Sequence, residues 1–293
     1  MFSNYCLLSV MTLVMAWLGG LEFAIARCND QNFTSLEVNY AITWGRSHVS
    51  FQDQGRQIQL SMDKSSGSGF GSKLNYSSGF FDLMMKLPNK DSAGIVTAFY
   101  LSSHTSDHTE LDFEFLGNRE GKPITLQTNV FINSHGEREQ RLFLWFDPTA
   151  NFHHYQILWN SYQTVFYVDD VPVRVFQNLS FAGVEYLTQP MRIEASIWNG
   201  EDWATDGGEE KINWDYAPFL AQFQGFDVEG CDSDGGLDCS SGELWWNVER
   251  YRELSSDEKE AYEKVKRSYL YYDYCKDVAR FPHHLPPECK LMQ

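Results

Sequence analysis

The chain has 293 residues, of which 43% are hydrophobic. That is enough for a sizeable core, and it fits one large β domain better than two medium ones. Forty acidic residues against 23 basic ones give a formal net charge of −17. Because nucleic acids and anionic membranes are bound through Lys and Arg, this balance argues against both as partners. The charge fits an uncharged partner, such as a neutral polysaccharide.

The first residues carry a targeting signal. The apolar run 7–18 is followed by the small-residue sequence Ala24-Ile25-Ala26. The run is shorter than the ~20 residues that span a bilayer, and this order is typical of a secretory signal peptide. We therefore expect residues 1–26 to be removed and the mature chain to begin near Arg27. A buried core helix or an uncleaved anchor is the alternative, since residues 1–6 contain no Lys or Arg.

Short apolar segments, separated by turn residues, fill the chain from about residue 36 to 225. In chain order they are 48–61, 79–87, 94–101, 108–117, 124–132, 141–146, 154–159, 164–168, 173–176 and 191–198. Asn160-Ser161 and Asp169-Asp170 separate neighbouring segments as hairpin turns do. Many short strands at regular spacing predict an all-β sandwich or jelly roll.

The glycine-rich stretch 67–73 superficially resembles a phosphate-binding loop. It lacks the spacing of such a loop, and strand-like sequence rather than a helix follows it. We expect a glycine-rich turn beside a strand.

The C-terminal part differs in character. Residues 226–243 are rich in Gly, Asp and Ser and predict a loop. Ser255 and Glu258 have the spacing of a capping box, which predicts a helix running to about Ser268. The aromatic segment 269–274 is expected to add a strand to a sheet edge.

Six cysteines fit an exported protein. Four of them allow three pairings, and the local pairs Cys231–Cys239 and Cys275–Cys289 are the simplest because each closes a short loop. Zinc is the alternative, but neither a CxxC motif nor a histidine at ligand spacing accompanies them. The sequence does not place Cys28. Sequons at Asn32, Asn75 and Asn178 are candidate glycosylation sites.

Three acids alternate along the segment 108–117. Leu111, Phe113 and Phe115 lie on one face of the expected strand, and Glu110, Asp112 and Glu114 lie on the other. A solvated strand face would more often include Lys, Ser or Thr, and three adjacent acids repel one another. The alternatives are a calcium site or a chance acidic face.

The spacing of the acids suits glycoside hydrolysis. At ~3.3 Å per residue the Cα atoms of Glu110 and Glu114 lie about 13 Å apart, so inclined side chains bring the carboxylates to about 5 Å, as retaining glycosidases require. One carboxylate must be ionised to attack the anomeric carbon, and the other protonated to assist departure of the oxygen. Asp112 between them can hold a proton and separate their pKa values.

The strand ELDFEFLG, residues 110–117, resembles the catalytic strand of the plant xyloglucan endotransglucosylase/hydrolases of glycoside hydrolase family 16. The resemblance covers most of the mature chain, in segments 39–45, 67–70, 127–130, 144–149, 157–160, 190–193, 202–205 and 274–289. It implies a concanavalin A-like fold, a curved two-sheet β-jelly-roll sandwich over residues 27–225 with a cleft on its concave face. A C-terminal extension, 226–293, would add a short helix and a strand.

The resemblance also implies residue roles. Glu110 would be the nucleophile, Glu114 the acid/base and Asp112 the assistant in a double displacement. Amide groups suit sugar hydroxyls and aromatic rings suit sugar faces. The implied sugar contacts are Tyr100, Glu114, Gln127, Thr128, Asn129, Glu137, Arg138, Glu139, Trp198, Asp202, Trp203, Gly207, Tyr272 and Arg280. On residue type alone Trp198 would be assigned to the core. Neither a cofactor nor a metal is expected.

The chain departs from the family pattern at three places. Thr109 stands where Asp commonly precedes the first Glu, and a missing anion lowers the pKa of neighbouring acids. Asn118-Arg119-Glu120 is not a sequon, although many members carry one directly after the catalytic strand. Glu137 stands where Asp is commoner.

We therefore expect a monomeric, secreted enzyme of the plant cell wall and apoplast that acts on donor and acceptor xyloglucan chains. It would not associate with a membrane after signal cleavage. Transfer is favoured over hydrolysis, because no long insertion around the cleft motifs indicates a specialised hydrolase. The alternatives are a catalytically silent, lectin-like jelly roll and the same chemistry on another β-glucan.

Overall fold

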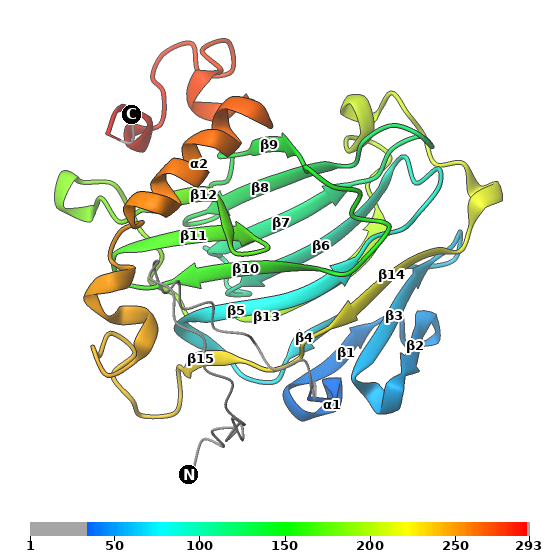
Figure 1. The fold of residues 1–293 in the computed structure, drawn as a ribbon, viewed down its shortest axis with the longest axis horizontal. Helices are drawn as coiled ribbons and strands as arrows, with labels where there is room; N and C mark the ends of the chain where they lie inside the picture. The colour runs from blue at the N-terminus through cyan, green and yellow to red at the C-terminus, as the bar shows by residue number, and fades with distance from the viewer. Residues whose placement is uncertain (1–33, 292–293) are drawn as a thin grey trace, which may run out of the picture. The chain divides into compact units, whose positions relative to one another are not determined.

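A computed structural model of the protein describes residues 34–291. The expected signal peptide, Cys28 and the sequon at Asn32 lie outside the described residues. Antiparallel strands form two sheets that lie face to face (Figure 1). The predicted all-β sandwich is confirmed.

The first sheet has eight strands and carries the acidic strand near its middle. Its spatial order is β1 (Tyr40–Trp44), β4 (Ser68–Ser72), β13 (Arg192–Asn199), β6 (Ile95–Ser102), β7 (Glu110–Leu116), β8 (Thr125–Phe131), β9 (Gln140–Phe143) and β16 (Leu270–Asp273).

The second sheet also has eight strands, one of them off the main path. Its order is β12 (Val171–Gln177), β11 (Gln163–Val168), β10 (His153–Trp159), β5 (Tyr76–Lys86), β14 (Phe219–Gln224), β3 (Gln57–Met62) and β2 (Val49–Gln52), and β15 (Glu229–Asp232) pairs with β5.

Helices are few in the described part. The α-helices are α1 (Leu36–Asn39) and α2 (Ser256–Ser268). Short 3-10 turns are η1 (Arg46–His48), η2 (Asp53–Gly55), η3 (Ser180–Ala182), η4 (Thr205–Gly208), η5 (Trp214–Tyr216), η6 (Trp245–Asn247), η7 (Glu249–Tyr251), η8 (Tyr274–Lys276) and η9 (Pro287–Lys290).

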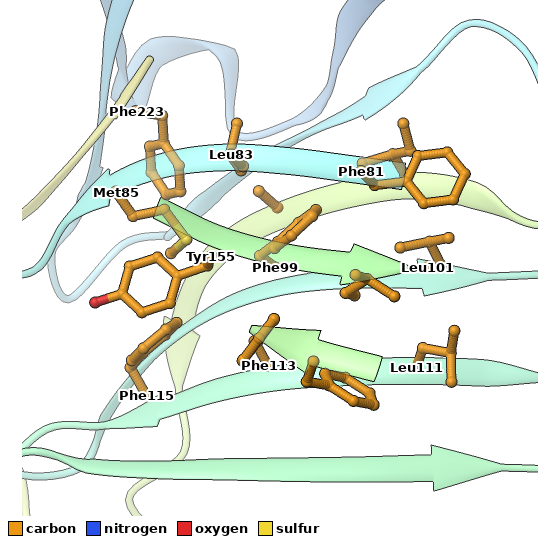
Figure 2. Close-up of a cluster of buried hydrophobic side chains, with 14 of the residues drawn as sticks. Phe81, Leu83, Met85, Phe99, Leu101, Leu111, Phe113, Phe115, Tyr155 and Phe223 are labelled. Carbon is orange, nitrogen blue, oxygen red and sulfur yellow. The ribbon is translucent and has the colours of Figure 1, made fainter. Parts of the chain in front are cut away.

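The core lies between the two sheets. Phe113 of β7 packs against Phe99 of β6 in its own sheet and against Tyr155 of the second sheet (Figure 2). It also packs against Phe166 of the second sheet, with ring centres 5.1 Å apart. All four side chains are fully buried. Because strand side chains alternate between faces, this anchoring of the odd-numbered residues of β7 turns its even-numbered residues outward.

Two expected elements differ from the structure. The segment 48–61 is not one strand but a hairpin, because Asp53 and Gln54 take positive φ angles and turn the chain between β2 and β3. The glycine-rich stretch is not a turn. It forms strand β4, whose five residues are all buried between β1 and β13.

Residues after 225 add to both sheets. β15, inside the expected loop 226–243, pairs with β5, and β16 pairs with β9 at the edge of the first sheet, as expected. Helix α2 begins at the predicted capping box, in which the Ser255 hydroxyl accepts from the Glu258 amide. Residues 34–291 fall within one compact unit.

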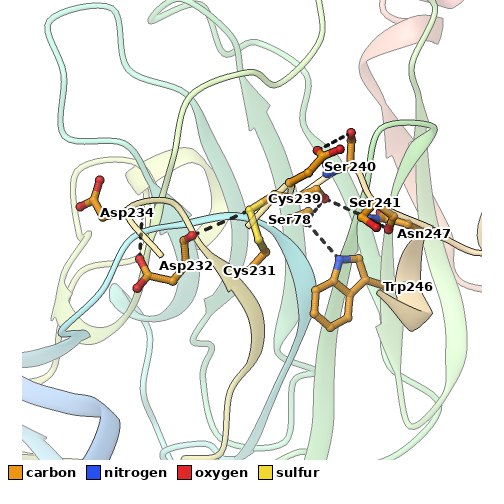
Figure 3. Close-up of a disulfide and its surroundings, with 10 residues drawn as sticks. Ser78, Cys231, Asp232, Asp234, Cys239, Ser240, Ser241, Trp246 and Asn247 are labelled. Atoms are coloured by element: carbon orange, nitrogen blue, oxygen red, sulfur yellow. Dashed lines mark hydrogen bonds between the residues drawn. A yellow bond between two sulfur atoms is a disulfide. The ribbon is translucent and has the colours of Figure 1, made fainter. Parts of the chain in front are cut away.

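Both local disulfides are present. Cys231–Cys239 closes the loop after β15, and Cys275–Cys289 closes the C-terminal loop. Beside the first, the Ser78 hydroxyl of β5 donates to the Cys239 carbonyl at 2.7 Å and accepts from the Trp246 indole at 3.0 Å (Figure 3). These bonds fix the loop to the second sheet.

A buried ion pair joins the C-terminal segment to the first sheet. Arg138, just before β9, donates to the fully buried Glu288 carboxylate at 2.6 Å. Removing one partner of such a pair leaves an uncompensated buried charge, which typically costs about 3–5 kcal/mol.

Two candidate glycosylation sites lie in the described part. Asn75 and Asn178 are half-buried, and the Asn178 side-chain amide donates to the Ser161 carbonyl at 2.7 Å. Glycosylation at either remains a prediction. None of the helices between residues 34 and 291 is both long and apolar enough to cross a membrane.

Candidate active site

The acidic face of β7 lines a groove. Glu110, Asp112 and Glu114 form its floor, in a hollow of about 380 Å³. The other lining residues are Trp44, Ala98, Tyr100, Asn129, Phe131, Ser196 and Trp198. A larger hollow of about 540 Å³ lies around residues 118–124 and 144–149, but none of the three acids lines it.

The sheet register aligns the groove residues in rows. Asp112 is paired with Tyr100 on β6 and with Asn129 on β8, so these three side chains point to the same side. Glu114 is paired with Ala98 and Gln127 in the neighbouring row. Each carboxylate therefore has one neighbour from the preceding strand and one from the following strand.

Asp112 has the most shielded carboxyl of the three, with 5% of the residue exposed. Burial raises its pKa well above the usual value, and the negative charges of Glu110 and Glu114 and a hydrogen bond to Glu110 raise it further. The buried Arg174 guanidinium opposes these effects. These effects favour the protonated form of Asp112, which in that form can donate its proton to the hydrogen bond with Glu110.

The pKa of Glu114 lies near neutral pH. Burial raises its pKa to about 7, while the Gln127 amide, which donates to its Oε2 at 2.7 Å, lowers it. Glu110 and Glu139 raise the pKa of Glu114, and Arg141 lowers it. A carboxyl with this pKa can give up a proton and take one back at neutral pH, which is what a general acid/base requires.

A polar chain extends from Glu114 across β8, β9 and β16. The Arg141 Nε donates to Gln127 Oε1 at 2.7 Å, and its guanidinium lies 5.3 Å from the centre of the Tyr272 ring. Arg280 continues the chain, because it donates to the Tyr272 hydroxyl at 3.1 Å and to Glu139 at 2.6 Å.

Aromatic rings border the groove on the opposite side of β7. Trp44 of β1 lies over the glycines of β4, where a Cβ added to Gly69 would come within 2.5 Å of its indole nitrogen. Trp198 lines the groove, and its ring centre lies 5.9 Å from that of the half-buried Trp203. Exposed aromatic faces of this kind can stack on sugar rings.

Several sequence-predicted residues lie elsewhere. Thr128 points into the core, where its hydroxyl accepts a hydrogen bond from Arg174 at 3.0 Å, so a sugar in the groove cannot reach it. Arg138 is engaged by the buried Glu288. Asp202 is exposed and paired with Lys211, and Gly207 lies in η4 with open space around it.

The remaining predicted residues are near the polar chain or the acids. Glu137 is exposed, with its carboxylate 3.9 Å from Arg280. Asn129 lines the groove, and its Oδ1 accepts from the backbone amides of Val130 and Arg138. No group of three or more potential metal ligands is arranged to hold an ion within residues 34–291.

Sequence reasoning missed Trp44, which lines the groove, and three residues that contact its neighbours: Arg141, Glu194 and His104. Trp44 and Arg141 were accessible to it, because Trp44 lies in the segment 39–45 and Arg141 shares a strand face with Glu139. Glu194 and its partner His104 lie 90 residues apart, and no local pattern connects them.

An antiparallel sandwich with a groove over two glutamates and an intervening aspartic acid has the architecture of a retaining glycoside hydrolase. The comparisons agree with this class. Residues 36–216 match the model of glycosyl hydrolases family 16, and residues 240–289 match that of the xyloglucan endo-transglycosylase (XET) C-terminus. The chain belongs to glycosyl hydrolase family 16, among the xyloglucan endotransglucosylase/hydrolases.

Named relatives match along nearly the whole chain. Xyloglucan endotransglucosylase/hydrolase protein 2 of Arabidopsis thaliana is 53% identical over 99% of both chains. Xyloglucan endotransglucosylase protein 34 of Populus tremula x Populus tremuloides is 49% identical over 86% of both.

Solved structures share the fold at lower identity. The Bacillus licheniformis β-glucanase superposes with a TM-score of 0.52 at 22% identity, covering 64% of this chain and 89% of its own. The apo Crh5 transglycosylase superposes with a TM-score of 0.53 at 21% identity, covering 72% of this chain and 83% of its own.

Proposed function

We propose that this protein is a secreted cell-wall enzyme that cleaves a xyloglucan backbone and joins the new end to a second xyloglucan chain or to water. The relatives that match along nearly its whole length carry this activity in their names. The groove is open to solvent and lined by polar and aromatic side chains, which suits an uncharged polysaccharide.

The carrying observation is the arrangement of the three acids on β7, together with the raised pKa of two of them. Burial and neighbouring charge raise the pKa of Asp112 well above its usual value and bring that of Glu114 to about 7. In the first step a Glu110 carboxylate oxygen bonds to the anomeric carbon while the bond from that carbon to the glycosidic oxygen breaks. Glu114 gives its proton to the departing oxygen.

The second step reverses these roles. Glu114, now ionised, takes the proton from an incoming hydroxyl, whose oxygen bonds to the anomeric carbon as the bond to Glu110 breaks. Asp112, which is hydrogen-bonded to Glu110, orients that carboxylate. Because neither residue distinguishes water from a sugar hydroxyl, the balance depends on how well an acceptor chain occupies the groove.

The aromatic and polar walls support transfer as the main outcome. Trp44 and Trp198 lie on one side of β7 and Tyr272 and Arg280 on the other, so side chains of types that suit sugars lie on both sides of the acids. A well-held acceptor hydroxyl has a far higher effective concentration than a free one.

The test incubates the purified mature protein with xyloglucan and a fluorescent xyloglucan oligosaccharide. We expect the label to enter the polymer and the polymer to shorten. Binding without either change would leave a lectin-like protein. Cleavage of mixed-linkage glucan but not of xyloglucan would assign the same chemistry to another substrate.

A further inference from the structure

A fourth acid, Glu194, lies beside the catalytic row and has no role in the mechanism above. It belongs to β13 and is paired with Tyr100, which is in turn paired with Asp112. These three side chains therefore lie in one row on the groove face. Glu194 is buried, with 7% of the residue exposed.

A carboxylate at this place carries a cost. It stands next to three other acids, and a buried polar group needs hydrogen-bond partners to offset the contacts with water that it has lost. Within residues 34–291 its only ion-pair partner closer than 4 Å is His104, whose Nε2 lies 2.9 Å from Glu194 Oε1. A neutral residue of similar size would avoid this cost, so the carboxylate must make contacts that compensate for it.

Two polar contacts use the carboxylate oxygens. The Tyr100 hydroxyl donates a hydrogen bond to Glu194, and the His104 ring approaches from the loop between β6 and β7. Gly71 of β4 leaves the space that Glu194 occupies, because a Cβ there would lie 3.2 Å from Glu194 Oε1.

The loop that carries His104 is fixed without this contact. Thr105 and the Asp107 carbonyl are held by the Gln189 side chain at 2.7 and 2.6 Å, and the Ser134 hydroxyl donates to the Ser106 carbonyl at 2.9 Å. His104 itself has a φ of 51°, a conformation that costs a non-glycine residue free energy. The fixed loop thus holds the imidazole against Glu194, rather than Glu194 holding the loop.

We propose that Glu194, supported by His104, is a positioning residue that fixes the Tyr100 hydroxyl next to Asp112 and so sets the geometry in which the sugar meets the nucleophile. This inference rests on the proposed function. We call this series of contacts the relay. It runs from loop 103–109 through His104, Glu194 and Tyr100 to the three acids of β7.

A double-mutant cycle on kcat/KM for label incorporation tests the relay. Glu194→Ala is expected to lower kcat/KM about tenfold and Tyr100→Phe by a similar factor, as for the loss of a hydrogen bond to a charged group. In the Tyr100→Phe background, Glu194→Ala is expected to lower kcat/KM by less than a further factor of about two, because the hydroxyl that Glu194 positions is already absent. His104→Ala is expected to cost about threefold.

Two further variants separate positioning from folding. Glu194→Gln retains an acceptor oxygen and is expected to stay within about threefold of the parent. Asp82→Asn is the matched control, because Asp82 and His154 form a pair of the same 2.9 Å length on the second sheet, away from the groove. It should leave kcat/KM unchanged. Thermal unfolding midpoints show whether each variant is folded.

The proposal would be overturned if the losses in kcat/KM from Glu194→Ala and Tyr100→Phe were additive. It would also be overturned if the Glu194→Ala and His104→Ala proteins were folded and as active as Asp82→Asn. Label incorporation by the parent protein tests the proposed function separately. If the parent cleaves another β-glucan instead, the same cycle applies to that substrate.

Discussion

The two sides of strand β7 differ in their chemistry. On the β8–β9–β16 side lies the polar chain, in which Arg141 donates to Gln127 and stacks on the Tyr272 ring, whose hydroxyl accepts from Arg280. On the β6–β13–β4–β1 side, Trp44 and Trp198 present aromatic rings.

The difference separates two tasks. Groups on the β8 side act on the pKa of Glu114, since Gln127 and Arg141 lower it while Glu139 raises it. The β6 side presents the aromatic rings, which suit a sugar face, and the Tyr100 hydroxyl. We infer that one side sets the proton equilibrium of the acid/base and the other sets the position of the substrate.

The largest expected effect comes from the acids between the two sides. Glu110→Ala and Glu114→Ala should each lower kcat for polymer cleavage by at least about a thousandfold, because one removes the proposed nucleophile and the other the proposed proton donor. Viscometry of xyloglucan solutions measures the loss. Glu253→Ala, which breaks an exposed ion pair with Lys259, is the control. Full activity in either active-site variant contradicts the assigned roles.

A smaller effect is expected when the aromatic side alone is disturbed. Gly69→Ala places a Cβ 2.5 Å from the Trp44 indole, so the ring must move from the groove. We expect KM for xyloglucan to rise about tenfold, the scale of a lost aromatic contact, with no change in the pH profile. Gly242→Ala, where the added Cβ meets no atom within 4 Å, is the control. An unchanged KM would show that Trp44 does not bind sugar.

The smallest effect is a shift of the pH profile from the polar side. The proposed mechanism requires protonated Glu114, so kcat/KM should fall above about pH 7. Glu139→Gln removes an anion, lowers the pKa of Glu114 and moves this limb to lower pH. Arg141→Gln removes a cation, raises the pKa of Glu114 and moves the fall of kcat/KM to higher pH. Each of the two shifts should be at most about one pH unit. Shifts in the same direction would contradict the electrostatic account.

Much of this site could be predicted from period-two alternation. It placed Glu110, Asp112 and Glu114 on one face of a strand whose other face is core. The same rule, applied to residues 127–129, places Thr128 inward, where it contacts Arg174. The family resemblance assigns Thr128 to the sugar contacts together with its neighbours Gln127 and Asn129, whereas strand alternation assigns its side chain to the core.

Other features depend on distant contacts. The raised pKa of Glu114 comes first from burial, which the sequence does not state. The hairpin within 48–61 depends on Asp53 and Gln54, two non-glycine residues that take positive φ angles. The relay through Glu194 joins residues from a loop and a strand far apart in the chain. Only the assembled sheet brings these groups together.

The most direct test of the account traps the covalent intermediate. Glu114→Ala enzyme is mixed with an activated xyloglucan-oligosaccharide donor, whose leaving group needs no proton, and digested for peptide mapping by mass spectrometry. The account predicts a glycosyl adduct on Glu110 within the peptide that contains β7. Release of the leaving group with no adduct, or an adduct on any other residue, would contradict it.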